Sequence, residues 1–106
     1  MITIRHYRLQ NGRHPFRDWL MDLPDLRART AVLRRIDRLA DGNFGEHRFL
    51  DAGVSELKID VGPGYRVYYA QEGKTVVLLL CAGSKRTQQK DIARAVEYWN
   101  DHQARS

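Results

Sequence analysis

Three cations are placed where they could hold a phosphate group. Arg66 lies within an alternating stretch, 65–69, while Lys85 and Arg86 follow an apolar stretch, 75–81, and directly precede a predicted helix. The start of a helix offers free backbone N–H groups and the positive end of its dipole to an anion. Arginine and lysine side chains there could stabilise charge on phosphoryl oxygens. The pattern therefore predicts a phosphate-binding site at Arg66, Lys85 and Arg86.

The distance between these cations depends on how the last two predicted strands pair. A two-residue turn at 72–73 would place Arg66 opposite Leu79. Lys85 lies a few residues past that point, so the two backbones would be about 10–15 Å apart at about 3.3 Å per residue. Two long side chains can bridge that gap.

Other side chains could extend this site into an RNA-binding surface. Tyr68, predicted on the same face as Arg66, could stack on a base. The further cations that could contact phosphates are Arg34, Arg38, Arg48 and Lys58. Arg34 and Arg38 belong to the arginine-rich face of a predicted pair of helices.

Structural roles compete with each of these assignments. Arg66 opposite Asp60 could form only a cross-strand ion pair, and Lys85 with Arg86 could be a solvated loop. The four histidines show no metal-ligand spacing, and Cys81 ends a predicted buried strand. No metal ion and no cofactor is therefore expected.

The first forty residues predict a strand followed by two helices. The strand covers 2–9, Pro15 suits the first position of a short helix, and Asp25 suits the start of a second one. Gly42 is typical of the position after a helix end. Arg35 and the other arginines of the second helix are expected to point mostly outward. Its expected buried stripe consists of Val32, Leu33, Ile36, Leu39 and Ala40.

A β-hairpin is predicted around the turn 62–64. Residues 56–61 and 65–69 alternate strictly between apolar and polar side chains. If Val61 pairs with Tyr65, the apolar side chains of both strands share one face that packs against helices. The opposite face would carry Glu56, Lys58, Asp60, Arg66 and Tyr68.

A third strand and a last helix complete the predicted fold. The stretch 75–81 is apolar on both faces, as in an interior strand, and Thr87 could cap the helix that follows. The buried stripe of that helix would be Ile92, Val96 and Trp99. The predicted class is α+β: an N-terminal strand, a two-helix hairpin, a three-stranded meander completing a curved antiparallel sheet, and a C-terminal helix.

Composition sets the broad class of protein. The 106 residues include 18 Lys+Arg against 13 Asp+Glu, giving a net charge of +5, and only one cysteine. This length predicts one compact domain, and a lone cysteine fits a reducing cytoplasm. No membrane partner is expected, because the longest apolar run, 76–82, is about a third of a membrane span. The basic charge favours nucleic acid as a partner, although an acidic protein would also fit.

Four stretches together resemble the RelE/ParE toxin superfamily, and most closely its phage Gp49-like, HigB-type branch. They are 16–20, 42–50 running into 53–59, 62–69 and 83–88. The Gly-Pro-Gly-Tyr-Arg turn combined with Lys-x-Thr-Gln before the last helix is their specific feature.

The resemblance implies a single RelE/HigB-like toxin domain over residues 1–106, the toxin of a bacterial type II toxin–antitoxin module. Its partner would be a helix-turn-helix, HigA-like antitoxin, and a toxin–antitoxin heterotetramer is one expected assembly. Many RelE-like members are metal-independent endoribonucleases that cut mRNA on the translating ribosome. Two alternatives share the fold: a ParE-like inhibitor of DNA gyrase, and an inactive prophage toxin that only binds its antitoxin.

The resemblance places the cations of the family on Arg66 and Lys85, with Arg86 beside them. The implied reaction is attack of a ribose 2′-OH on the adjacent phosphorus. Several RelE-like nucleases have a tyrosine or histidine shortly after the last strand, whereas residues 87–91 contain neither. Ser84 stands where the closer branch commonly has an aspartate. The candidates for a general base, unranked, are Glu56, Lys58, Asp91 and Tyr68.

Overall fold

The computed structural model describes residues 1–105. The elements, in chain order, are β1 (Thr3–His6), α1 (Pro15–Asp22), α2 (Leu26–Ala40), β2 (His47–Phe49), β3 (Ser55–Ile59), β4 (Tyr65–Glu72), β5 (Val76–Ser84), a 3-10 turn (Lys85–Thr87) and α3 (Gln88–Arg105). This order confirms the predicted α+β class, with its helix pair and C-terminal helix. No helix within the described residues is long and apolar enough to cross a membrane.

The strands form one five-stranded sheet in the order β1-β5-β4-β3-β2. The prediction of a purely antiparallel sheet is wrong, because β1 pairs in parallel with β5 while the other neighbours are antiparallel. β2 was not predicted, since its three residues are all exposed and show no burial pattern.

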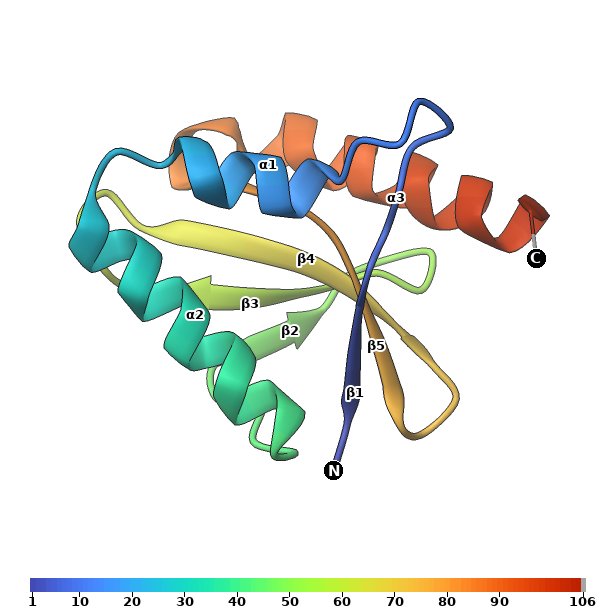
Figure 1. The fold of residues 1–106 in the computed structure, drawn as a ribbon, viewed down its shortest axis with the longest axis horizontal. Helices are drawn as coiled ribbons and strands as arrows, with labels where there is room; N and C mark the ends of the chain where they lie inside the picture. The colour runs from blue at the N-terminus through green and yellow to red at the C-terminus, as the bar shows by residue number, and fades with distance from the viewer. Residues whose placement is uncertain (106) are drawn as a thin grey trace.

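Helices cover both faces of the sheet. Figure 1 shows α1 and α2 on one side of the strands and α3 on the other. Leu57 and Val67 face α1 and α2, as predicted, within a core that also contains Phe16 and Val32. Tyr68 belongs to a second core, which α3 closes through side chains that include Ala95. The sheet is therefore the middle of three layers.

Local signals place the helix ends correctly. Pro15 begins α1, and the Asp25 carboxylate accepts hydrogen bonds from the first N–H groups of α2 at 2.9 and 3.4 Å. Gly42 follows the end of α2 with a φ of 91°, a conformation that glycine adopts without a steric penalty. The predicted buried stripe of α2 is wrong at Leu33, which is 46% exposed, because the helix turns Ala28 to the core instead.

Both predicted strand registers are shifted. Tyr65 pairs with Ile59 rather than Val61, because the connection between β3 and β4 is longer than three residues. Arg66 pairs with Gly83 rather than Leu79. The turn between β4 and β5 is longer than two residues, and a β-bulge lies at 68–69.

Candidate functional site

The observed register brings Arg66 close to the start of α3. Arg66 lies opposite Gly83, which is two residues before Lys85. The predicted partner of Arg66, Leu79, is six residues before Lys85. A methyl group on Gly64 would lie 3.8 Å from Lys85 Cβ and 3.9 Å from Arg66 Nη1. The backbone N–H of Lys85 also donates to the Gly64 carbonyl at 3.0 Å. Arg66 and Lys85 therefore lie beside the same turn, through a register that differs from the predicted one.

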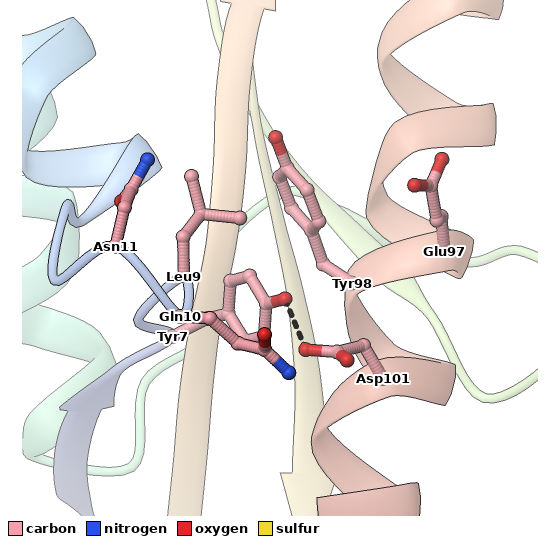
Figure 2. A pocket seen from close by; sticks show the side chains of 7 residues that line it. All are labelled: Tyr7, Leu9, Gln10, Asn11, Glu97, Tyr98 and Asp101. Carbon is pink, nitrogen blue, oxygen red and sulfur yellow. Dashed lines mark hydrogen bonds between the residues drawn. The ribbon is translucent and has the colours of Figure 1, made fainter.

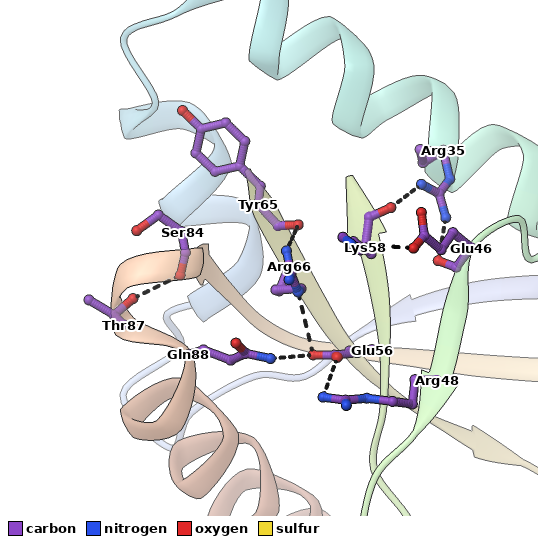
Figure 3. A network of polar contacts seen from close by, with 10 residues as sticks. All are labelled: Arg35, Glu46, Arg48, Glu56, Lys58, Tyr65, Arg66, Ser84, Thr87 and Gln88. Carbon is purple, nitrogen blue, oxygen red and sulfur yellow. Dashed lines mark hydrogen bonds and ion pairs between the residues drawn. The ribbon is translucent and has the colours of Figure 1, made fainter. Parts of the chain in front are cut away.

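A groove of about 440 Å³ opens beside Arg66. Its lining residues are Glu46, His47, Arg48, Glu56, Lys58, Arg66 and Gln88. Most of them appear in Figure 3, where β2, β3, β4 and the first turn of α3 contribute side chains. Arg48 and Lys58 were predicted as further cations that could extend the basic face, and both line this groove together with Arg66.

Glu56 is the centre of this groove's polar contacts (Figure 3). Its carboxylate is 2.9 Å from Arg48 Nη2 and 3.8 Å from Arg66 Nε, and it accepts a hydrogen bond from Gln88 Nε2 at 3.4 Å. Glu56 is 4% exposed and Arg66 is 7% exposed. The predicted ion pair between Arg66 and Asp60 is therefore wrong, because the shifted register gives Arg66 a different carboxylate.

The electrostatic balance of the groove favours an anion. Two arginines share one buried carboxylate, so one positive charge is left over at this point. Arg66 Nε, although buried, has no hydrogen-bond partner among residues 1–105. A buried donor without a partner costs free energy, and the Glu56 carboxylate, at 3.8 Å, is too far away to accept a hydrogen bond from it.

Arg35 ties α2 to the backbone beside this groove, a contact that the sequence analysis missed, and its own side chain lines a neighbouring groove along α2. Its guanidinium donates to the carbonyls of Lys58, Phe44 and Glu46, the last two at 3.1 and 2.9 Å. Burial and the neighbouring Arg38 lower the pKa of Arg35 from its ordinary value. The prediction that Arg35 points outward is wrong, because its guanidinium reaches three backbone carbonyls, of β3 and of the segment before β2.

Lys85 and Arg86 are exposed on the 3-10 turn between β5 and α3. They stand at the end of β5, as predicted, but outside the lining of the groove itself. Thr87 does not cap α3. Its hydroxyl donates to the Asp91 carboxylate at 2.5 Å, which ties the turn to the helix.

Tyr68 is not available to stack on a base. Its side chain is fully buried beneath α3, and burial raises its pKa well above the ordinary value. The sequence analysis treated this face of the sheet as open, whereas α3 covers it. Cys81 lies under the same helix, where burial raises the pKa of its thiol to about 12.

The general-base candidates separate by their contacts and by whether they line the groove rather than by exposure, since Glu56 is as buried as Asp91. Tyr68 is sealed, and Asp91 is 6% exposed, with its carboxylate held by Thr87 and packed on Gly83. The Lys58 side chain is 43% exposed, and its Nζ lies 3.5 Å from Glu46 Oε2. Glu56 alone of the candidates is a carboxylate that lines the groove next to Arg66.

His47 lines the groove without placing its ring beside Arg66. His47 pairs with Leu57, whose side chain faces the α1–α2 core, and its ring is 5.4 Å from that of Phe44. Side chains of paired residues share a face of the sheet. The His47 ring therefore lies on the other face from Arg66.

Arg34 and Arg38 lie apart from Arg66. They line a second groove, between α2 and the β3–β4 connection, together with Ala31, Ile59 and Val61. The structure therefore does not join these two predicted RNA-binding residues to the Arg66 groove.

The fold and the groove define a small basic α+β protein with a groove in which two arginines pair with one buried carboxylate. The chain belongs to the family described as "Phage derived protein Gp49-like (DUF891)", whose model matches residues 18–99. It is also similar to an "Uncharacterized protein" of Haemophilus influenzae, 48% identical over 80 residues, which are 76% of this chain and 81% of that protein. Membership of the Gp49-like family, the branch that the sequence resembled, indicates a protein related to the toxins of toxin–antitoxin pairs.

Proposed function

We propose that this protein is the toxin of a type II toxin–antitoxin pair and cuts mRNA on the ribosome. The observation that carries the proposal is the convergence of Arg66 and Lys85 on the Gly64 turn, beside a groove whose buried carboxylate is Glu56. Cations fixed before the substrate arrives stabilise the charge that grows on the phosphoryl oxygens in the transition state.

The proposed reaction needs no group beyond these side chains and the RNA. The ribose 2′-oxygen attacks the adjacent phosphorus and gives its proton to the Glu56 carboxylate. The bond from phosphorus to the 5′-oxygen breaks, and Lys85 supplies the proton that this oxygen takes up. The products are a 2′,3′-cyclic phosphate and a 5′-OH. Arg66 and Arg86 hold the phosphate, and the ribosome aligns the message.

The test is to map message ends after the toxin is induced without its antitoxin. We expect growth arrest and new 5′-OH ends within translated codons by primer extension, because the reaction leaves that group. The catalytic variant Lys85→Ala should give neither. Intact messages with blocked supercoiling would instead show an inhibitor of DNA gyrase, and intact messages with normal growth would show an inactive toxin. Either result contradicts the proposal.

We also propose that the α2 groove receives the antitoxin. Two adjoining hollows share Ala31, Arg34 and Val61 and run along α2 from Leu26 to Arg38. Leu26 is 68% exposed, and the apolar lining is bordered by four arginines, Arg27, Arg34, Arg35 and Arg38, against one acid, Asp60. An amphipathic helix with an acidic border would bury the floor and pair with the rim.

Removing two rim charges should weaken antitoxin binding. We expect Arg27→Gln with Arg34→Gln to raise the Kd for the cognate antitoxin about tenfold, largely through a slower association rate, since rim charges steer encounter. Isothermal titration calorimetry and stopped-flow mixing measure both quantities. The matched control is Arg5→Gln with Arg8→Gln, which removes the same charge from another surface. If both double variants weaken antitoxin binding equally, the α2 groove is not the antitoxin site.

A further inference from the structure

A third hollow, of about 320 Å³, lies at the outer edge of β1. It is lined by Arg5, His6, Arg8, His14, His102 and Arg105. Every lining residue is an arginine or a histidine, and none is acidic or aliphatic. All six lie outside residues 18–99, so the match to the Gp49-like family does not account for them.

The two ends of the chain build this cationic hollow together. Arg105, in the last turn of α3, donates to the Arg8 carbonyl at 2.6 Å and lies 5.4 Å from the centre of the Tyr7 ring. Asp101 is 2.7 Å from the Arg105 guanidinium and accepts a hydrogen bond from the Tyr7 hydroxyl at 2.5 Å (Figure 2). Tyr98 stacks on Tyr7 with the ring centres 4.7 Å apart. These contacts hold Arg105 in place over the edge of β1.

Positive charge in the hollow is only partly balanced. Arg105 forms an ion pair with Asp101, which also accepts the hydrogen bond from Tyr7. His102 lies 3.0 Å from the Glu72 carboxylate. Arg5 and Arg8 are exposed and form no ion pair within residues 1–105. Burial, His14 and Arg17 lower the pKa of His6, so the site already repels a further proton.

The lining selects the chemistry of the ligand. Guanidinium groups match phosphate oxygens two at a time, and an amphipathic protein segment would need an apolar floor such as the one along α2. We propose that this cationic hollow binds the phosphodiester backbone of RNA, as a second contact remote from the Arg66 groove. The choice of RNA as the phosphate source rests on the proposed function.

The position of the hollow suits an extended ligand. It lies at the C-terminal end of α3, whereas Lys85 and Gln88 lie at the N-terminal end. Eighteen helical residues separate these ends by about 27 Å at about 1.5 Å per residue. One stacked strand of about eight nucleotides, at about 3.4 Å each, would reach from one site to the other.

The experiment measures binding of a fluorescein-labelled 20-nucleotide single-stranded RNA by anisotropy. We expect Arg5→Gln with Arg8→Gln to raise the Kd at least tenfold at low salt. The slope of log K against log salt should also fall by about 1.4, which corresponds to two lost phosphate contacts. The matched control, Arg27→Gln with Lys74→Gln, removes the same charge from exposed positions outside the hollow and should change the Kd less than threefold. Glutamine keeps part of each side chain, and melting curves confirm that both variants are folded.

Three results would overturn this inference: no binding of the RNA by the unmodified protein, equal losses in both variants, or loss of antitoxin affinity alone in the Arg5–Arg8 variant. Message cleavage is followed separately, as described for the proposed function. RNA binding that depends on Arg5 and Arg8 without any cleavage would leave this inference standing and refute the nuclease. Message cleavage by a protein whose RNA binding does not depend on Arg5 and Arg8 would refute this inference and leave the nuclease proposal standing.

Discussion

Lys85→Ala should lower the rate of message cleavage about a hundred- to thousandfold. A cation that stabilises a transition state lowers the activation barrier by about 3–4 kcal/mol. Removing an exposed side chain from a turn costs little stability. Lys85 is exposed, so the variant should keep its fold. The measurement is the cleavage rate on purified translating ribosomes, beside a thermal melt of the free toxin.

The control for this prediction is Lys74→Ala, which removes the same charge from the exposed turn between β4 and β5. It should leave the cleavage rate within about threefold, because a distant surface charge acts only through screened electrostatics. If Lys74→Ala and Lys85→Ala slow cleavage equally, Lys85 has no special role in the reaction.

Arg66 needs a different substitution, because it is buried against Glu56. Arg66→Ala would remove one partner of a buried carboxylate, so it should lower stability as well as activity. Arg66→Lys keeps the charge but loses the planar fork. We expect it to retain the fold while cleavage falls by a smaller factor than in Lys85→Ala. Full activity in Arg66→Lys would show that the fork is not used.

Gly83→Ala should have the largest effect on stability, a loss of about 3 kcal/mol or more. Its new methyl group would lie 1.9 Å from Asp91 Oδ2, a distance that real Cβ contacts do not reach, and a tight 3.0 Å from Thr87 Oγ1. Overpacking of a filled site costs about 1–3 kcal/mol and occasionally more, out of a typical total of about 5–15 kcal/mol. Urea unfolding measures the change.

A double-mutant cycle isolates the cause. Asp91→Ala alone should cost about 0.5–1.5 kcal/mol, because the exposed Thr87 hydroxyl loses one hydrogen bond and keeps the Ser84 carbonyl as an acceptor. In the double variant the carboxylate is gone, so Gly83→Ala should cost much less than it does alone. Additive losses would mean that the clash with Asp91 is not the reason for glycine at this position.

The helix ends and the inner face of the hairpin could be predicted from local chemistry. Asp25 caps α2, Pro15 begins α1, and Leu57 and Val67 face the core as their alternation indicated. Each of these features depends on residues close together in the sequence. The sequence also predicted that the strand of Arg66 pairs with the strand that leads to Lys85, whereas the observed register decided how close the two residues lie.

Which residues make up the candidate site depended on tertiary contacts. Strand alternation fixes which face a side chain takes, but a slip of two residues keeps every side chain on its face. The pattern therefore could not distinguish Asp60 from Glu56 as the partner of Arg66, and the length of the connection decided it. Burial of Tyr68 required α3 to fold over the second face of the sheet. The cationic hollow required the two ends of the chain to meet, which no local pattern records.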